Sequence, residues 1–430
     1  MKYAVYTLGC KVNQYETQAI ETMLKDRGFE PVEEHADVIL VNTCAVTAES
    51  GRKSRQAIRR LMQKHPGALT AVCGCFSQLE PEAVKELGAD IVFGSGEKEK
   101  LVEAIVARFP VTEIDDPFRR MTFEPLPAGA AAGRTRAMLK VEDGCVNFCA
   151  YCIIPYARGA VRSLPLEAAV AQAVGLRERG YREIVVTGIE LSSWGQDLKT
   201  CQGPAELIGA ICAAVPEVRI RLGSLEPRTV TKSFCETLSG YSNLCPQFHL
   251  SLQSGCDETL RRMRRKYDTG RFLMSCRLLR ETFPDCAVTT DLIVGFPGET
   301  EEEFARTLAF LREAAFSAMH IFPYSRREGT PAAAMPNQIP NGEKASRAAR
   351  AGAVERELRQ AYRERFLGRT MEVLFEQAPK GRAMHGFTEN YIRVELPPAS
   401  DNHLLDNQIR RVCLGGFNRD QSALQVTLCS

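Results

Sequence analysis

The segment Val141-Glu-Asp-Gly-Cys145-Val-Asn-Phe-Cys149-Ala-Tyr-Cys152 places three cysteines within eight residues. This spacing is too short for a disulfide framework, but it allows three thiolates to bind one metal centre from a single loop. Cysteine thiolate is the preferred ligand of iron–sulfur clusters. A four-iron cluster held by three cysteines leaves one iron open, and an open position is typical of a metal that takes part in chemistry.

The pattern alone also allows a zinc site or three buried structural cysteines. Zinc usually takes four ligands grouped as two pairs, and no second pair follows nearby in the chain. The spacing therefore favours the iron–sulfur interpretation over zinc.

Length and composition limit the number of domains and the classes of function that the chain can have. A chain of 430 residues with 44% apolar residues is expected to form two or three domains. Lys+Arg 55 against Asp+Glu 53 leaves almost no net charge, so a nucleic-acid site must be a local patch. Neither a membrane span nor a signal segment is recognisable, and we expect a cytoplasmic protein. Its sixteen cysteines are then expected to be reduced.

The N-terminal region alternates strands with helices. Apolar strands are expected at 1–8, 36–44, 68–75 and 89–94, and a helix is expected from Glu16 to Arg27. This order predicts a parallel α/β sheet, in which ligands bind at the carboxyl ends of the strands.

Three cysteines that are far apart in sequence each stand at such a strand end: Cys10, Cys44 and Cys75. We interpret them as the ligands of a second three-cysteine cluster with an open iron. The alternative is three unrelated buried thiols. Cys73 is expected to share a face of its strand with Cys75, but the position of Cys75 at the strand end favours Cys75 as the ligand.

After a Pro- and Gly-rich linker at 110–133, six strand candidates alternate with helices, which predicts a partial α/β barrel. These candidates are 136–142, 182–187, 218–222, 247–252, 288–294 and 317–322. The loops after the strands carry glycines and polar side chains suited to a ribose, an amino group and a carboxylate. The predicted cofactor-binding residues are Tyr151, Gly188, Glu190, Ser224, Glu226, Gln253 and Gly295.

Basic residues gather in two places. Arg264 and Arg265 belong to the densest positive patch, and Arg326 and Arg327 follow the sixth strand. We predict that these four bind the substrate through phosphate or carboxylate groups, although carboxylates of the same chain are an alternative partner for the first pair. His249 and His320 are expected to be packed strand histidines.

The C-terminal region has a different character. A helix is expected from Gly342 to Phe366, and short alternating strands follow it. Four or five strands in about 60 residues suggest an OB-like barrel, a fold often used to hold RNA. The predicted domains are residues 1–125, 131–365 and 366–430.

With these parts in place, the chain resembles the radical S-adenosylmethionine methylthiotransferases, which combine an N-terminal three-cysteine domain, a radical barrel and a C-terminal TRAM domain. Two motifs look most like the branch that acts on threonylcarbamoyladenosine in tRNA. They are Thr7-Leu-Gly-Cys10-Lys11-Val-Asn-Gln-Tyr-Glu-Thr17 and Tyr324-Ser-Arg-Arg-Glu-Gly-Thr-Pro331.

The resemblance implies a mechanism with two 4Fe–4S clusters and S-adenosylmethionine. The cluster on Cys145, Cys149 and Cys152 would cleave the cofactor to a radical that removes hydrogen from C2 of adenosine-37 in the anticodon loop. The cluster on Cys10, Cys44 and Cys75 would supply the sulfur. The implied partners are tRNA and an electron donor of unknown identity.

Other functions remain open on the sequence. The same chemistry on isopentenyladenosine-37 or on a ribosomal protein aspartate is the alternative within the family. A non-enzymatic RNA-binding iron–sulfur sensor would need the clusters and the TRAM domain but not the polar loops of the barrel. A structural zinc protein would need neither the clusters with the TRAM domain nor the polar loops.

Overall fold

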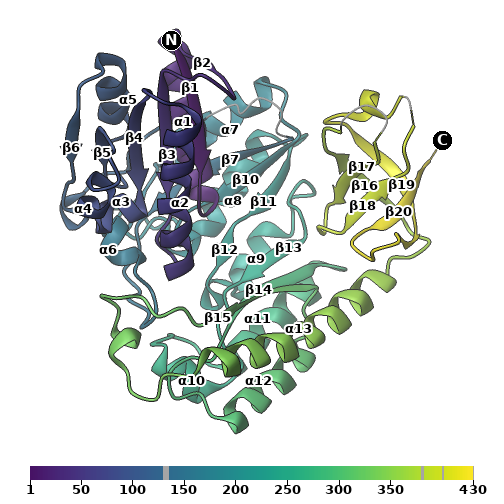
Figure 1. Cartoon of the computed structure of the whole chain (residues 1–430). Helices are drawn as coiled ribbons and strands as arrows, with labels where there is room; N and C mark the ends of the chain where they lie inside the picture. Colours follow the sequence, from purple (N-terminus) through teal and green to yellow (C-terminus); the bar gives the residue numbers. More distant parts are fainter. Residues whose placement is uncertain (129–134, 379–381, 400, 430) are drawn as a thin grey trace.

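The structure is a computed structural model that describes residues 1–128, 135–378, 382–399 and 401–429. Figure 1 shows an N-terminal α/β unit on the left, a central half-barrel and a small C-terminal barrel on the right. The expected fold class is confirmed in all three parts. The junction at 129–134, where the predicted linker ends, lies outside the described residues.

The N-terminal unit contains one parallel sheet in the order β2-β1-β3-β4-β5-β6. Its strands are β1 (Lys2–Thr7), β2 (Glu30–Pro31), β3 (Val38–Thr43), β4 (Leu69–Gly74), β5 (Ile91–Phe93) and β6 (Val111–Glu113). Strands β3 and β4 are buried along their whole length, as expected for the centre of a doubly covered parallel sheet.

Helices cover both faces of this sheet. They are α1 (Lys11–Asp26), α2 (Ala48–Lys64), α3 (Cys75–Leu79), α4 (Pro81–Lys85) and α5 (Lys98–Ala107). Ile20 of α1 and Leu101 of α5 share one apolar core, whereas Ile58 of α2 and Val84 of α4 belong to a second.

Two expectations for this unit are wrong. Helix α1 begins at Lys11, five residues before the predicted start, and its buried apolar face already includes Val12 and Tyr15. The segment 110–133 was predicted to be a linker, but its residues Val111–Glu113 form the edge strand β6. Three residues after a proline are too few to show an alternating pattern.

The central unit contains the six expected strands. They are β7 (Arg136–Lys140), β10 (Glu183–Thr187), β11 (Arg219–Leu222), β13 (Gln247–Leu250), β14 (Ala287–Val294) and β15 (Ala318–Pro323). The short strands β8 (Glu142–Asp143), β9 (Arg162–Ser163) and β12 (Ser224–Leu225) lie in the loops between them. Its helices are α6 (Ile154–Arg158), α7 (Leu166–Glu178), α8 (Pro204–Ala214), α9 (Lys232–Leu238), α10 (Asp257–Arg262), α11 (Thr269–Thr282) and α12 (Glu301–Ala314).

These strands form a half-barrel with two edges. The sheets β11-β10-β7 and β12-β13-β14-β15 meet through a bridge between Ile220 and Leu244, which leaves β7 and β15 as the outer strands. Outward residues such as Ile184 are in the apolar core, whereas Glu183 and Arg221 face inward and pair with each other. The interior of the half-barrel is therefore polar.

The N-terminal unit spans the opening between these two edges. Helix α1 packs against β7, and Tyr15 donates a hydrogen bond of 2.7 Å to the carbonyl of Leu126. On the other edge, the loop after β15 contacts α2, where the Ala48 amide donates to Ser325 Oγ at 3.0 Å. We call the space between β7, β15 and α1 the lateral opening.

The C-terminal unit follows the long helix α13 (Asn341–Glu364). Its strands β16 (Thr370–Phe375), β17 (Met384–Thr388), β18 (Arg393–Leu396), β19 (Ile409–Phe417) and β20 (Leu424–Leu428) close into a barrel. It contacts the amino-terminal ends of the half-barrel strands, where Arg136 lies over the ring of Phe387 and Arg221 lies over the ring of Tyr391. Short 3-10 turns occur at Pro117–Arg119, Leu191–Ser193, Pro227–Thr229, Pro331–Ala334 and Asn402–Leu405.

Within the described residues, no helix is both long enough and apolar enough to cross a membrane.

Candidate functional site

The cysteines Cys10, Cys44 and Cys75, which we call the strand-end cysteine group, follow the neighbouring strands β1, β3 and β4. Cys44 and Cys75 are buried, whereas Cys10 is exposed. Gly9 has a φ of +110°, and a Cβ at this position would lie 3.1 Å from Cys44 Sγ. A side chain at Gly9 would therefore occupy the space beside that thiol.

Cys73 and Cys75 lie on opposite sides of the sheet, which corrects the expectation that they share a face. Cys73 packs in the core with Ala19 and Phe93, and Cys75 packs in the core with Ile58. The cause is Gly74, whose φ of +105° ends the strand and turns the chain into α3. This turn directs Cys75 toward Cys44 and Cys10, whose charges act on its thiol.

The cysteines Cys145, Cys149 and Cys152, which we call the loop cysteine group, follow β7 and β8. The Cys152 amide donates to the carbonyl of Cys149 at 2.9 Å, so the loop is tightly turned. Arg265 Nη1 donates to Cys149 Sγ at 3.1 Å. Burial raises the pKa of Cys145 and of Cys152 to about 12, so a metal that binds these thiols displaces their protons.

The sulfur atoms of each group are too far apart for one tetrahedral ion. Zinc–sulfur bonds of about 2.3 Å hold the ligand sulfurs about 4 Å from one another. In neither cysteine group do all three sulfurs lie within 4.8 Å of one another, and all six residues are described. Both groups therefore fit a larger metal cluster better than they fit zinc.

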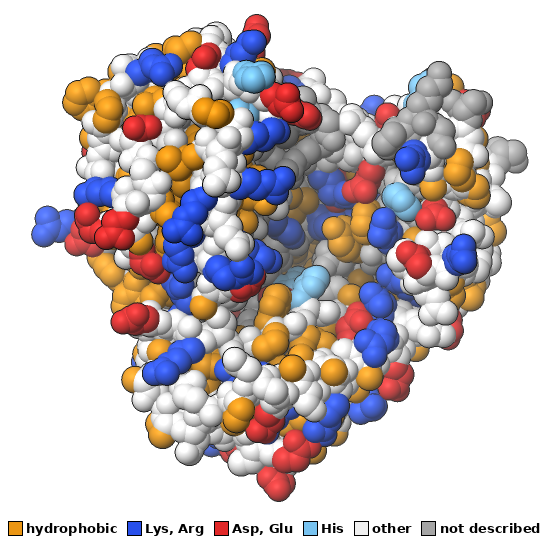
Figure 2. Space-filling view, in the orientation of Figure 1, with side chains coloured by type: hydrophobic (Ala, Val, Ile, Leu, Met, Phe, Trp, Pro, Cys, Tyr) orange, Lys and Arg blue, Asp and Glu red, His pale blue; other side chains and the backbone are white. Residues whose placement is uncertain are grey.

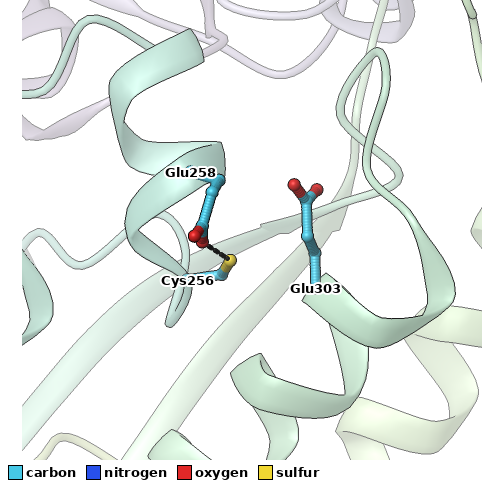
Figure 3. Close-up of side chains that lie close together, drawn as sticks. All are labelled: Cys256, Glu258 and Glu303. Carbon is cyan, nitrogen blue, oxygen red and sulfur yellow. Dashed lines mark hydrogen bonds between the residues drawn. The ribbon is translucent and has the colours of Figure 1, made fainter.

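A compact set of possible metal ligands occurs elsewhere, at Cys256, Glu258 and Glu303, which Figure 3 shows. These side chains already have partners. Cys256 Sγ donates to Glu258 at 2.9 Å, and Arg262 binds Glu303. Arg306 lies 3.3 Å from Glu258. The set is a largely buried, ion-paired contact between α10 and α12.

A buried ion network of Glu16, Lys140, Asp143 and Arg158 joins the N-terminal unit to the half-barrel. Arg158 Nη1 lies 2.6 Å from Glu16 and 3.2 Å from Asp143, and Lys140 Nζ lies 3.0 Å from Glu16 and 2.7 Å from Asp143. Burial alone would raise the pKa of Glu16, but Arg158 and Lys140 lower it to about 2. All four side chains are therefore charged at neutral pH.

This network lies between the two cysteine groups. Arg158 Nη2 also donates to Asn13 Oδ1 at 2.9 Å, and Cys10 Sγ donates to the same oxygen at 3.7 Å. Arg158 ends α6, which begins two residues after Cys152. One guanidinium thus positions the helices that follow a cysteine of each group.

The carboxyl ends of the strands surround a cavity of about 230 Å³. Its lining is polar and consists of Val146, Asn147, Glu190, Ser192, Ser193, Gln196, Glu226, Arg228, Thr229 and Lys266. Burial raises the pKa of Glu190 to about 7, and its Oε1 has no hydrogen-bond partner among the described residues. Glu226 is paired with Arg228 at 3.0 Å. Glu190 is therefore suited to bind a cationic group of a ligand.

Two of the seven predicted cofactor-binding residues, Glu190 and Glu226, line this cavity. The others do not: Tyr151 packs beside Phe296, Ser224 is exposed on β12, and the Gln253 amide donates to the Asp291 carbonyl. Gly188 faces Glu142, whose Oε2 would lie 2.6 Å from an added Cβ, and the Gly295 amide donates to Glu299. These five residues therefore make contacts within the loops and do not form the wall of this cavity.

The four predicted substrate-binding arginines are spread over three places. Arg264 lines a small hollow beside Cys149, and Arg265 contacts Cys149 itself. Arg326 is exposed and donates to the Ala333 carbonyl at 2.9 Å. Arg327 is buried against the N-terminal unit, where it lies 3.8 Å from Glu80.

The lateral opening contains both histidines that were expected to be packed. His249 Nδ1 lies 3.0 Å from Thr289 Oγ1, and its Nε2 lies 3.4 Å from Asp291. His320 is exposed on β15, so the expectation for that residue is wrong. Among the described residues, β15 is the edge of its sheet and no further strand pairs with it to cover His320. Lys11 of α1 is exposed toward this space, where partial desolvation by the surrounding protein and the charge of Arg221 lower the pKa of Lys11.

The buried ion network was not predicted from the sequence, although a signal was present. Glu16 occurs at helical spacing between the buried residues Val12 and Ile20, and Lys140 is a buried charge that directly follows Leu139 at the end of β7. A charge at such a position is buried, and a buried charge requires a partner. The identity of the partner could not be obtained without the fold.

Family and structural comparisons agree with this architecture. Residues 2–94 match the uncharacterized protein family UPF0004, and residues 139–311 match the radical SAM superfamily. The chain is similar in fold to the radical S-adenosylmethionine methyltransferase TsrM from Kitasatospora setae, with a TM-score of 0.55 at 16% identity, and the match covers 77% of this chain and 76% of that chain.

Sequence relatives cover nearly the whole chain. The threonylcarbamoyladenosine tRNA methylthiotransferase MtaB of Bacillus subtilis is 39% identical over 93% of this chain and 91% of the relative. The protein of the same name from Thermotoga maritima is 36% identical over 91% of this chain and 90% of the relative. A tRNA-2-methylthio-N(6)-dimethylallyladenosine synthase from Symbiobacterium thermophilum is 33% identical over 91% of this chain and 88% of the relative.

Replacing Arg158 with alanine is expected to reduce the free energy of unfolding by about 3–5 kcal/mol, because Glu16 and Asp143 lose a buried partner. Urea denaturation measured at pH 7 tests this. The matched control is Arg52→Ala, since Arg52 pairs with Glu49 on the exposed face of α2 and its loss should cost less than about 1 kcal/mol. Equal effects of the two substitutions would contradict the role given to the network.

Proposed function

Because the chain belongs to the radical S-adenosylmethionine tRNA methylthiotransferase family, we propose that it converts N6-threonylcarbamoyladenosine at position 37 of tRNA to the 2-methylthio derivative. The enzyme is a transferase, and tRNA is its substrate. A tRNA-modifying enzyme meets its substrate in the cytoplasm, and we propose that location for this protein.

One structural observation supports methylthio transfer above other radical chemistry. The N-terminal unit covers the opening of the half-barrel, so that the strand-end and loop cysteine groups lie on either side of Arg158. A base that enters the lateral opening can then meet both groups. Transfer of a sulfur atom to a carbon that must first lose hydrogen requires such a shared space.

The radical SAM family implies one 4Fe–4S cluster and S-adenosylmethionine. The loop cysteine group would hold this cluster, and the spacing of its sulfurs fits a group larger than a single ion. When bound, the pair supplies one-electron chemistry that can break an unactivated C–H bond, which no acid or base of a protein can do near neutral pH.

We propose that the strand-end cysteine group holds a second cluster, which is the source of the sulfur. Cys10 is the exposed member, so the open side of the cluster would face the lateral opening. Cys44 and Cys75 are buried and would anchor it. Cys73, on the other side of the sheet, is a packing residue.

The chain's own residues are assigned as follows. Glu190, with an unpartnered carboxylate oxygen, would bind the amino group of the cofactor, and Arg265 would contribute positive charge beside the loop cluster. Glu226 lines the same cavity and remains a predicted cofactor-binding residue. Five further residues remain predicted cofactor-binding residues because they belong to the loops near this cavity: Tyr151, Gly188, Ser224, Gln253 and Gly295.

For the nucleic acid, we propose that the C-terminal barrel, residues 366–430, binds tRNA as a TRAM domain and that the anticodon loop enters the lateral opening. The N-terminal domain would be residues 1–125 and the radical domain residues 131–365. Arg264 is exposed beside Cys149 and remains a predicted phosphate contact. The electrons for cofactor cleavage would come from a separate reducing protein.

A second candidate substrate is isopentenyladenosine-37, because relatives named for the dimethylallyl product are 31–34% identical to this chain. The two substrates differ in one physical respect. The threonylcarbamoyl group carries a carboxylate and a hydroxyl, whereas the isopentenyl group is apolar.

Mass spectrometry of tRNA nucleosides from cells that lack this gene tests the proposed substrate. We expect 2-methylthio-threonylcarbamoyladenosine to disappear, its unthiolated precursor to accumulate, and the isopentenyl-derived nucleosides to stay unchanged. Loss of the methylthio-isopentenyl nucleoside instead would refute the assignment. Return of the product with a plasmid-borne copy is the control.

Anaerobic reconstitution is expected to load about eight irons per chain. Alanine at Cys145, Cys149 and Cys152 should leave about four irons and abolish cofactor cleavage, and alanine at Cys10, Cys44 and Cys75 should also leave about four irons but keep cleavage without product. Cys73→Ala is the matched control and should keep full iron. A strand-end triple variant that still held all the iron would show that the second cluster lies elsewhere.

The affinity for S-adenosylmethionine should depend on pH through Glu190. Its pKa is about 7, so the carboxyl loses its charge as the pH falls and binds the cationic amino group less well. We expect the dissociation constant to rise about tenfold from pH 8 to pH 6. Equilibrium dialysis of the loaded enzyme measures this. Glu190→Gln should remove the dependence and Ser193→Ala should keep it; a dependence that survives in Glu190→Gln would contradict the assignment.

A further inference from the structure

Lys11 is a cation in the lateral opening that has no partner among the residues that the structure describes. It immediately follows Cys10, and it begins α1, the helix that packs against β7. Its side chain is exposed, and it makes no hydrogen bond or ion pair with any residue that the structure describes. Its ammonium group is close enough to Arg221, Glu183 and Asp291 to be affected by their charges, and all three face the interior of the half-barrel.

Four other cations near this space, Arg136, Lys140, Arg158 and Arg221, already have acidic partners. Arg221 binds Glu183 at 2.9 Å, and Arg136 binds Glu183 at 2.7 Å as well as Glu376. Lys140 and Arg158 belong to the buried ion network. The positive charge of Lys11 is therefore available to a ligand.

The surface next to Lys11 is open and suited to a planar base. His320 is exposed, and Phe322 on the same strand is 45% exposed although it is a large apolar side chain. Figure 2 shows a hollow between the N-terminal unit and the C-terminal barrel, with Lys and Arg side chains on its walls and a histidine at its floor. Rings of this kind stack on nucleic-acid bases.

We propose that the Lys11 ammonium binds the carboxylate of the threonyl group on N6 of the substrate adenosine. The inference rests on the proposed function. C2 and C6 of adenine flank the same ring nitrogen, so a base whose C2 approaches the cluster of Cys10 carries its N6 substituent within a lysine side chain's length of that residue. Arg326 and Arg327, predicted for this role, are engaged with the Ala333 carbonyl and with Glu80.

This contact would make Lys11 a specificity-determining residue. A carboxylate offers it a charge-assisted hydrogen bond, whereas an apolar isopentenyl group would displace water from the ammonium and offer nothing in return. Sites built around a polar partner reject analogues that lack it much more strongly than apolar pockets distinguish shapes.

The experiment compares two tRNA substrates, one with the free threonyl carboxylate and one with its methyl ester, in wild type and Lys11→Met. We expect wild type to prefer the acid by about 10- to 100-fold in kcat/KM. Lys11→Met should lose this factor on the acid but keep wild-type activity on the ester, and Lys11→Arg should restore part of the preference. Lys25→Met, an exposed lysine in the last turn of α1, is the matched control and should behave as wild type.

Iron content and cofactor cleavage in the absence of tRNA show whether each variant is intact. An undiminished preference for the acid in Lys11→Met, or an equal loss on acid and ester, would overturn the inference while leaving the proposed function in place. A wild-type enzyme without activity on either threonylcarbamoyl tRNA would instead refute the proposed function.

Discussion

The pairing of Arg158 with Glu16 and Asp143 is the interaction on which this architecture depends. Four charged side chains are removed from water at the junction of two domains, and they are tolerated there only because each charge faces an opposite one. Such a set accepts few alternative geometries. It therefore fixes α1, which follows Cys10, relative to α6, which follows Cys152, more strictly than an apolar contact could.

The half-barrel explains why a second domain is needed at this place. A closed barrel would fill its interior with side chains, whereas six strands leave β7 and β15 as edges around a polar interior. The N-terminal unit covers both edges and brings Cys10 and Lys11 to the gap between them. The C-terminal barrel holds the opposite end of the strands through Arg136 and Arg221. One space is thus bordered by the cysteines, by Lys11, which has no partner among the described residues, and by the domain proposed to hold RNA.

Much of this could be predicted from the sequence, for identifiable physical reasons. Apolar strands that alternate with helices gave the parallel sheet and placed Cys10, Cys44 and Cys75 at its edge, because strand ends are set by topology. Side-chain direction at a turn was not predictable: Gly74 separates Cys73 from Cys75 through a backbone angle that no periodicity reveals. The cavity lining and the partners of Glu16 and Lys140 depend on contacts across more than a hundred residues, such as Glu16 with Arg158. Strand β6 was missed because it is only three residues long.

The central claim is that the buried ion network holds the two cysteine groups in register, and the most direct measurement is the yield of 2-methylthio product per cofactor cleaved. This ratio should be compared between wild type and Glu16→Gln, each loaded with full iron. We expect Glu16→Gln to cleave the cofactor still but to convert a smaller fraction of those events into product. A ratio equal to that of wild type would contradict it.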